Sequence, residues 1–204
     1  EQLNKKADLD YVDNELNLVT QEFNQKMTQT YEDLFSRSVS VKFPFGLPLE
    51  SAKGDGITND TQAINNIIEY VHQKKLNNVF FPDGVYMIDG TKTSKWITGE
   101  GGIKLKSNVN RILSKNAIVR VIPNDEEHYD IVSGHGFENV KISGGKIEGD
   151  RKYHNGTTGE WGFGIKLLGT KNIIIEDTVV KDCWGDGLYL GRLNSEKRWC
   201  ENTV

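Results

Sequence analysis

The feature that most constrains this chain is a set of four short apolar segments that recur between Gly102 and Gly191. Each has a core of strand length, and their first residues lie 27, 35 and 23 positions apart. The segments are residues 102–105, 129–132, 164–167 and 187–190. Short β segments that recur at such a period, with insertions confined to loops, indicate a solenoid whose turns bury their apolar faces against one another. The repeat therefore predicts a parallel β-helix.

The middle two segments are each followed by a second strand-like run, at residues 137–142 and 170–175. Strand alternation sends every second residue to one face. The residues predicted to point into the bore are Ile165, Leu167, Ile173, Ile175, Val180 and Leu188. If the 23-residue step is the bare repeat, the 35-residue step holds 12 extra residues, and the polar stretch 149–161 has room for them.

Composition narrows the classes of partner. A net charge of −4 and a pI near 5.6 argue against nucleic acid, since phosphate binding favours a basic face. No signal peptide or apolar stretch of membrane length is seen, so we expect no membrane partner. Cys183 and Cys200 are expected to be idle thiols, with a disulfide left open. The chain begins at Glu1 and stops within what resembles a further repeat, so we expect a fragment of a longer protein.

The first part of the chain has the pattern of a coiled coil. Residues 3–34 contain no Gly or Pro, and their apolar residues alternate steps of three and four, which makes a heptad seam. The seam comprises Leu9, Val12, Leu16, Val19 and Phe23, continued in a shifted register by Met27, Tyr31 and Leu34. Leucine at a with a β-branched residue at d disfavours dimers. We therefore expect a trimeric coiled-coil stalk over residues 1–38; the alternative is one amphipathic helix packed on its own domain.

Residues 39–50 break this pattern with two prolines and a glycine, which indicates a neck or linker. Residues 54–61 then read as a turn that ends in two N-cap residues. Apolar residues at helical spacing predict a helix from there to about Lys74, and residues 79–81 and 85–88 predict two strands. A helix here suits the end of a solenoid, which needs a cap. Residues 51–204 are thus expected to form the capped first part of the β-helix.

Two motifs in this region resemble a known family. Residues 54–64 read Gly-Asp-Gly-Ile-Thr-Asn-Asp-Thr-Gln-Ala-Ile, and residues 79–86 read Val-Phe-Phe-Pro-Asp-Gly-Val-Tyr. Together they resemble the opening of the pectate-lyase-like right-handed β-helix superfamily, although the lead-in at 43–51 is longer and richer in proline than usual. A coiled-coil stalk before this opening resembles phage tailspikes and the pre-neck appendages of short-tailed phages. The resemblance implies an all-β, right-handed parallel β-helix with an N-terminal capping helix.

The same resemblance implies a function and partners. Family members are mostly trimers that bind or cleave host surface polysaccharide. The implied partners are a host polysaccharide or teichoic acid, further copies of the chain in a homotrimer, and phage collar or baseplate proteins. The implied location is the virion, after synthesis in the host cytoplasm.

The 149–161 insertion carries side chains suited to a carbohydrate site. It contains the carboxylates Asp150 and Glu160, the imidazole of His154, and the aromatic rings of Tyr153 and Trp161. Aromatic faces suit sugar rings. Glycoside hydrolysis needs two carboxyl groups, one protonated and one ionised, roughly 5–9 Å apart. The insertion is therefore the first candidate for a binding or catalytic site.

The next repeat adds Asp182, Trp184 and Asp186 before a strand and Arg192 after it. Because consecutive repeats stack, we predict Asp186 and Glu160 as the catalytic pair, with Asp182 and Asp150 as second choices. Trp184 or Trp161 would be the stacking platform, and the other predicted substrate contacts are His154, Tyr153 and Arg192. The alternative is that these acids satisfy local backbone amides in turns or are solvated loop charges.

No cofactor is expected. The four histidines, His72, His128, His135 and His154, lack the spacing of a zinc site, so no metal ligands are assigned. His135, in a Gly-His-Gly sequence, reads as a turn residue. The acidic run at 125–127 leaves open a divalent cation such as Ca²⁺, although a solvated charge run is the simpler interpretation.

Three functions compete at this stage. The first is an enzyme that depolymerises host glycan, as a glycosidase, a lyase or a teichoic-acid phosphodiesterase. The second is a virion adhesin that binds the polymer without cutting it. The third is a structural, stalk-proximal segment whose active groove lies beyond Val204.

Overall fold

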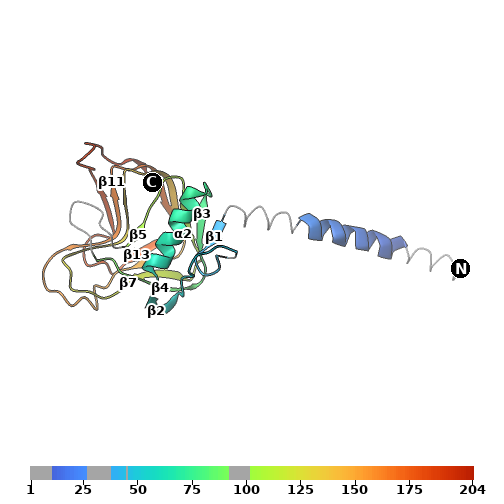
Figure 1. Cartoon of the computed structure of the whole chain (residues 1–204), viewed down its shortest axis with the longest axis horizontal. Helices are drawn as coiled ribbons and strands as arrows, with labels where there is room; N and C mark the ends of the chain where they lie inside the picture. Colours follow the sequence, from blue (N-terminus) through green and yellow to red (C-terminus); the bar gives the residue numbers. More distant parts are fainter. Residues whose placement is uncertain (1–10, 27–37, 45, 92–101) are drawn as a thin grey trace. The chain divides into compact units, whose positions relative to one another are not determined.

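The computed structural model describes residues 11–26, 38–44, 46–91 and 102–204. The chain divides into two compact units, residues 1–37 and residues 38–204, each considered by itself (Figure 1). Among the described residues, no helix is both long and apolar enough to cross a membrane.

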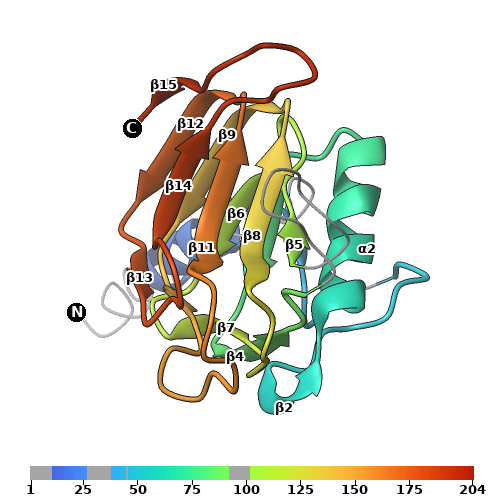
Figure 2. The ribbon, with the colours of Figure 1, turned by 90° about the vertical axis from the view of Figure 1, so that its left-hand side faces the viewer.

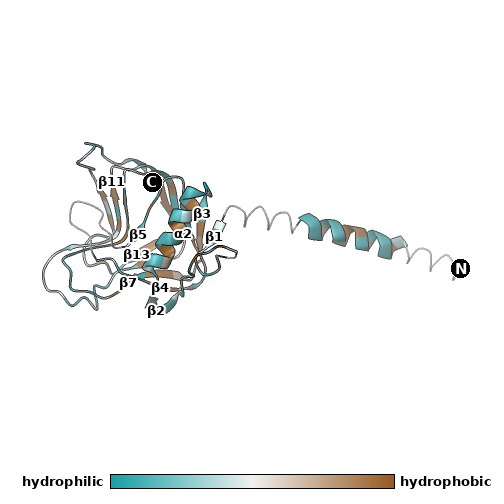
Figure 3. Cartoon of the chain, viewed as in Figure 1, coloured by the Kyte–Doolittle hydropathy of each residue, from teal (hydrophilic) through white to brown (hydrophobic). Residues whose placement is uncertain are grey.

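Residues 11–26 of the first unit are helical. The seam positions Val12, Leu16, Val19 and Phe23 are each more than half exposed in the single chain. Figure 3 shows apolar positions interspersed among polar ones along this helix. The other seam positions, Leu9, Met27, Tyr31 and Leu34, lie outside the described residues. The single chain thus leaves the described part of the seam uncovered, and the trimer remains a prediction.

The second unit is a parallel β-solenoid in which successive strands pass from one sheet to the next. Among the described residues, all pairings between the named strands are parallel, and each complete turn after the first adds one strand to each sheet. The predicted parallel β-helix is confirmed in this respect. Three sheets form its walls, and they are called sheets A, B and C here.

Sheet A has the strand order β1-β3-β6-β9-β12-β15. Its members are β1 (Ser38–Ser40), β3 (Asn78–Phe81), β6 (Asn110–Leu113), β9 (Glu138–Ser143), β12 (Lys171–Glu176) and β15 (Glu201–Thr203). Sheet B has the order β13-β10-β7-β4-β2. Its members are β2 (Asp55–Asn59), β4 (Gly84–Ile88), β7 (Ala117–Val121), β10 (Lys146–Glu148) and β13 (Val179–Lys181).

Sheet C has the order β14-β11-β8-β5 and contains all four of the repeated segments. Its members are β5 (Ile103–Lys104), β8 (His128–His135), β11 (Trp161–Leu168) and β14 (Leu188–Gly191). Figure 2 shows this sheet face on, with β5 between β8 and the helix α2 (Thr61–Gln73). The strands predicted at residues 79–81, 85–88, 137–142 and 170–175 are also present, whereas β2, β6, β7, β10, β13 and β15 were not predicted. Strand β2 occupies most of the segment 54–61, which was predicted as a turn.

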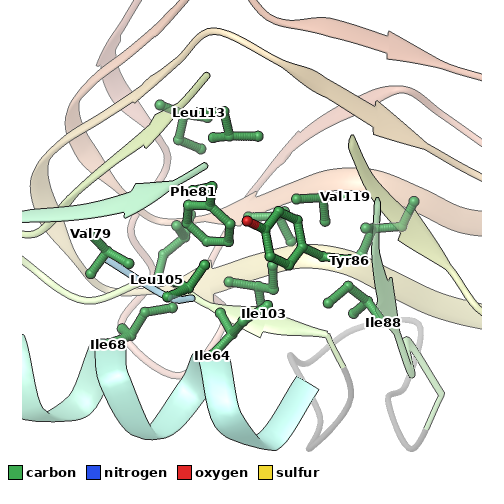
Figure 4. Close-up of a cluster of buried hydrophobic side chains, with 14 of the residues drawn as sticks. Ile64, Ile68, Val79, Phe81, Tyr86, Ile88, Ile103, Leu105, Leu113 and Val119 are labelled. Atoms are coloured by element: carbon green, nitrogen blue, oxygen red, sulfur yellow. The ribbon is translucent and has the colours of Figure 1, made fainter. Parts of the chain in front are cut away.

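The core lies between the three sheets and the apolar side of α2. The helix residues Ile64, Ile67, Ile68 and Val71 are fully buried, as their helical spacing predicted. Figure 4 shows Ile64 and Ile68 pointing from α2 toward Val79, Phe81, Ile103 and Leu105 of the solenoid. The helix therefore buries its apolar stripe against the first turns of the same core.

The turn before α2 differs from the prediction in how its polar side chains are used. Asp60 occupies the N-cap position but gives the helix no side-chain cap. Its carboxylate instead accepts hydrogen bonds from the backbone N–H groups of Lys53 and Gly54, at 2.7 and 2.9 Å. Asn59 accepts one from the N–H of Thr61 at 3.1 Å. The Gly-Asp-Gly segment, which leads into β2, is therefore held against the helix start by a buried carboxylate.

The predicted alignment of the repeat was wrong at its second member. It placed Ile103 opposite Asp130, whereas Ile103 pairs with Val132. A shift of two residues keeps each side chain on the same face, so the predicted bore residues Ile165, Leu167 and Ile173 are fully buried. The other three residues predicted to point into the bore are not fully buried: Ile175 and Val180 are partly buried, and Leu188 is exposed. Val180 and Leu188 lie in β13 and β14, the last strands of sheets B and C, and Ile175 lies in β12, the next-to-last strand of sheet A, so fewer neighbours cover them.

An asparagine ladder ties successive turns together. Asn139, Asn172 and Asn202 each donate a side-chain hydrogen bond, at 2.9–3.1 Å, to the asparagine of the preceding turn, and the ladder starts at Asn108. All four have φ between 51° and 63°, a left-handed conformation that asparagine tolerates better than most residues. The ladder asparagines thus both allow the left-handed backbone conformation and link successive turns of the solenoid by hydrogen bonds.

Candidate functional site

The structure brings both predicted catalytic carboxylates and both predicted stacking rings to one pocket. The pocket has a volume of about 470 Å³ and lies over the start of β11 and β14. Its lining residues are Arg151, Glu160, Trp161, Phe163, Trp184, Gly185, Asp186 and Tyr189. Here it is called the Trp pocket. Among the described residues, neither the Glu160 nor the Asp186 carboxylate takes part in a hydrogen bond or ion pair, so both are available to a ligand.

The pocket forms because the end of the insertion packs directly on the next turn of chain. The N–H of Gly185 donates to the carbonyl of Gly162 at 2.9 Å, and the N–H of Gly164 donates to the carbonyl of Asp186 at 3.0 Å. A Cβ at Gly185 would lie only 2.0 Å from the Glu160 carbonyl oxygen. Glycine is therefore required here, since any side chain would push the two carboxylate-bearing segments apart.

Behind the pocket, four side chains form a closed circuit that fixes Trp184. The Tyr129 hydroxyl donates to Asp150 Oδ1 at 2.7 Å and accepts from the backbone N–H of Trp184 at 3.0 Å. Asp150 Oδ2 lies 3.0 Å from His154 Nδ1, and the imidazole stacks on the indole of Trp184 with ring centroids 4.2 Å apart. This set is called the Asp150 circuit. Because His154 does not line the pocket, it supports the Trp184 ring from outside it.

The Asp150 circuit is buried, and the structure places Asp150 and His154 away from the exposed positions that their predicted roles require. The side chains of Asp150 and His154 are 1% and 0% exposed. Asp150 also accepts hydrogen bonds from the backbone N–H and side-chain amide of Asn124, at 3.1 and 3.2 Å. With both oxygens occupied, Asp150 is a positioning residue and not a free catalytic carboxylate. His154 positions Trp184 and does not face the Trp pocket.

Burial also affects the Tyr129 hydroxyl of the circuit. Burial, reinforced by the hydrogen bond to Asp150, raises the pKa of the Tyr129 hydroxyl above its ordinary value. The phenol therefore stays protonated and keeps donating to Asp150. The ring nitrogen His154 Nε2 and the indole Trp184 Nε1 are buried, and neither has a hydrogen-bond partner among the described residues.

The second tryptophan of the pocket is also backed by a histidine. Trp161 stacks on His128 of the neighbouring strand β8, with ring centroids 4.6 Å apart and planes 17° from parallel. The two residues are register partners, so the sheet itself places one ring over the other. Deeper in the pocket, Phe163 and Tyr189 are tilted rings 4.9 Å apart. The pocket thus has four aromatic side chains around two carboxylates.

Among the described residues that line the Trp pocket, Arg151 is the one cation. Its Nε donates to the carbonyl of Cys183 at 2.7 Å, which anchors the guanidinium over the turn that carries Trp184. With Glu160 and Asp186 opposite, the formal charges of the lining residues sum to about one negative.

Three predicted residues lie outside the Trp pocket. Tyr153 and Asp182 line a smaller hollow of about 200 Å³, which also contains Glu148 and Lys181. Asp182 has φ 53° and lies within 3.6–3.7 Å of Lys181 and Lys152, so it is a turn residue within an ion-pair cluster. Arg192 is exposed and lines none of these hollows. The structure therefore separates these three from the predicted catalytic pair.

Sequence reasoning did not assign roles to Tyr129, Phe163, Gly185 or Tyr189. A signal existed for Phe163, which shares strand parity with Trp161. None existed for Tyr129, because its partners Asp150 and Trp184 are distant in sequence and meet it only through stacking of the turns.

No metal or disulfide chemistry is evident in the part of the chain that the structure describes. No group of three or more His, Cys, Asp or Glu side chains there is arranged to hold a metal ion. Glu127, from the acidic run, accepts a hydrogen bond from the Thr158 hydroxyl at 2.8 Å. Cys183 and Cys200 are free thiols, and burial raises the pKa of Cys183 to about 11, so it is a poor nucleophile.

The comparisons with known proteins agree with this architecture. Residues 50–108 match the family described as rhamnogalacturonase A/epimerase, pectate lyase-like. The region includes the turn, helix and strand pair that suggested such a relationship. The solved structure of the pre-mature bacteriophage phi29 gene product 12 superposes with a TM-score of 0.61 at 23% identity, covering 89% of this chain and 23% of that one. The chain has a pectate-lyase-like parallel β-helix fold.

Two curated relatives come from Bacillus subtilis (strain 168). The uncharacterized protein YclG is 32% identical over 177 residues, which is 78% of this chain and 29% of YclG. The SPbeta prophage-derived uncharacterized protein YorA is 34% identical over 152 residues, which is 70% of this chain and 24% of YorA. This chain therefore spans less than a third of either relative.

Proposed function

We propose that this chain is part of a phage appendage or tailspike that binds host surface polysaccharide or teichoic acid and cleaves it. The observation that carries the proposal is the Trp pocket, where two unengaged carboxylates face a cavity walled by aromatic rings. Aromatic walls bind the apolar faces of sugar rings, and a carboxylate pair can supply the acid and the base, or the nucleophile, of glycoside cleavage.

Two further observations support the virion setting. One relative carries a prophage-derived name and aligns over 70% of this chain. A phage gene product has the same fold over 89% of it. Both proteins are much longer than this chain, so the activity proposed here belongs to the whole protein as much as to this segment.

A single experiment separates cleavage from binding. The chain is incubated with purified cell-envelope polysaccharide and with teichoic acid, and both new reducing ends and released phosphodiester products are measured. Retention of the polymer on immobilised protein is measured in parallel, with Trp184→Ala and Trp161→Ala as test variants and Trp199→Ala as the control, because Trp199 is exposed and lines none of the described hollows.

We expect product release by the native chain and polymer binding that is weakened by either pocket substitution but not by Trp199→Ala. Loss of a stacking platform should cost roughly 1–2 kcal/mol of binding, about tenfold in affinity. Binding without any product would favour an adhesin. If binding were unaffected by both pocket substitutions, the Trp pocket would not be the polymer site.

We also propose that the helix α2 caps the solenoid and that the N-terminal helix forms a trimeric coiled coil. Isolated helices of this length are marginal in water, and the exposed seam of Val12, Leu16, Val19 and Phe23 needs a partner. Sedimentation equilibrium should give a trimer. Leu16→Asp should give monomers whose β-type circular dichroism is unchanged, while Asp13→Asn, off the seam, should leave the trimer intact. A native chain that sediments only as a monomer at tens of micromolar would contradict the coiled coil.

A further inference from the structure

A second groove lies at the other end of the strands of sheet C, away from the Trp pocket. It consists of two adjoining hollows of about 590 and 390 Å³ that share His72 and Ser107 as lining residues. The first runs along α2 and the Leu76–Asn77 connection, and the second runs over residues 104–107 and 133–137. A contact of 3.3 Å between His72 Nδ1 and the Ser107 carbonyl oxygen crosses the groove where the two hollows meet.

The second hollow is lined by basic side chains, whereas the lining of the Trp pocket has a net negative charge. Its lining includes Lys104 and Lys106 together with His72 and His135, and none of its described lining residues is acidic. Lys106 forms an ion pair with Glu69 at 2.8 Å, but both side chains are about 40% exposed, so water screens the pair. In a chain of net charge −4, this is a local concentration of basic side chains, of which the lysines are cations.

A buried hydroxyl without a partner lies among these cations. Ser133 is fully buried, and its Oγ has no hydrogen-bond partner among the described residues. Ser133 is the register partner of Lys104 on the adjacent strand, so the hydroxyl and the lysine stem share one face of sheet C. Buried hydroxyls in native proteins are nearly always hydrogen-bonded, so an unsatisfied one beside a cavity calls for a partner from outside the chain, such as a ligand or an ordered water.

Phe137 and Leu105 add an apolar floor to the same hollow. An apolar floor, a buried hydroxyl and two lysines together match a sugar or polyol unit that carries an oxyanion. From these contacts we infer that the groove is a second binding site, selective for a carboxylate- or phosphate-bearing unit of a polymer. The oxyanion would meet Lys104 and Lys106, and the Ser133 hydroxyl would supply a hydrogen bond.

The inference is tested with small probes and amide-resolved NMR on the whole chain. The anionic probes are glucuronate, for a carboxylate source, and glycerol phosphate, for a phosphate source; glucose is the neutral control. We expect saturable shifts of amides in residues 104–107 and 133–137 with at least one anion, and none with glucose. The anion that binds identifies the source of the oxyanion. Raising the salt concentration should weaken the binding.

Matched variants show whether the named side chains are responsible. Lys104→Gln with Lys106→Gln should weaken binding by about tenfold or more, since charge-assisted hydrogen bonds are lost. The control is Lys141→Gln with Lys171→Gln, which removes two similarly exposed, ion-paired lysines that line neither hollow. That control should bind as the native chain does.

Ser133→Ala separates a binding role of the hydroxyl from a structural one, because the two roles predict different effects on melting temperature and on anion affinity. Removing a hydroxyl that has no partner should leave the melting temperature unchanged or raise it, while anion affinity falls. The inference is overturned if neither anion produces saturable shifts at millimolar concentration, if glucose binds equally well, or if the two lysine pairs have equal effects. A Ser133→Ala variant that binds as tightly as the native chain would also overturn the role given to the hydroxyl.

Discussion

Replacing Asp186 by asparagine should abolish polymer cleavage while leaving polymer binding nearly intact. The amide keeps the size of the carboxylate but cannot transfer a proton or act as a nucleophile, so turnover should fall by about 10²–10⁴-fold. Binding should persist because the pocket walls, Trp161 and Trp184, are unchanged. Turnover is measured by the release of reducing ends or phosphodiester products, and binding by retention of labelled polymer.

The control and the double variant make this test specific. Asp177→Asn is the control, because Asp177 is an exposed turn residue with φ 52° that asparagine adopts readily, and it lines no described hollow. Glu160→Gln should cost about as much turnover as Asp186→Asn. The double variant should be little worse than either single one, because paired catalytic groups act as a unit. Full turnover in the Asp186→Asn chain would remove this carboxylate from the mechanism.

Replacing the buried Asp150 by alanine should destabilise the β-solenoid more than a substitution at any exposed position of the 149–161 insertion. The change leaves the Tyr129 hydroxyl, His154 Nδ1 and the Asn124 N–H without their shared acceptor in a buried site. Removing one partner from such a network costs about 3–5 kcal/mol of unfolding free energy. Chemical denaturation followed by circular dichroism measures this loss.

The functional part of this prediction concerns Trp184. Without Asp150, His154 is no longer held against the indole, so the intrinsic fluorescence of Trp184 should change and polymer affinity should fall. Asp150→Asn should be milder, because an amide can still accept from His154 while donating to Tyr129. Asp125→Ala, an exposed acid close by, should stay within about 0.5 kcal/mol of the native chain. A chain with Asp150→Ala that is equally stable, with unaltered Trp184 fluorescence, would show that the Asp150 circuit does not position the pocket.

Several features of the fold and site were predictable because their signals are local. The apolar repeat predicted stacked parallel strands, and the spacing of Ile64, Ile67, Ile68 and Val71 predicted α2 with its buried side. The site prediction rested on one step of geometry: an insertion and the Trp-Gly-Asp-Gly turn fall on consecutive turns of the solenoid. That step was enough to place Glu160 and Asp186 at one pocket.

Features that depend on residues far apart along the chain were not predicted from the sequence. The alignment of residues 129–132 was off by two, because apolar alternation specifies the face of a strand but not its register. The asparagine ladder was missed because each of its bonds joins residues about thirty positions apart.

The amino-acid sequence by itself determined that this chain stacks short strands into a parallel solenoid, and that chemistry-bearing side chains gather where the insertion meets the next turn. Only the tertiary structure decided what each acid does. Asp150 and Glu160 belong to the same short loop, yet one is buried among four donors and the other faces an open pocket. The physical reason is that burial and hydrogen bonding depend on partners such as Tyr129 and Trp184, which reach the loop only when neighbouring turns stack.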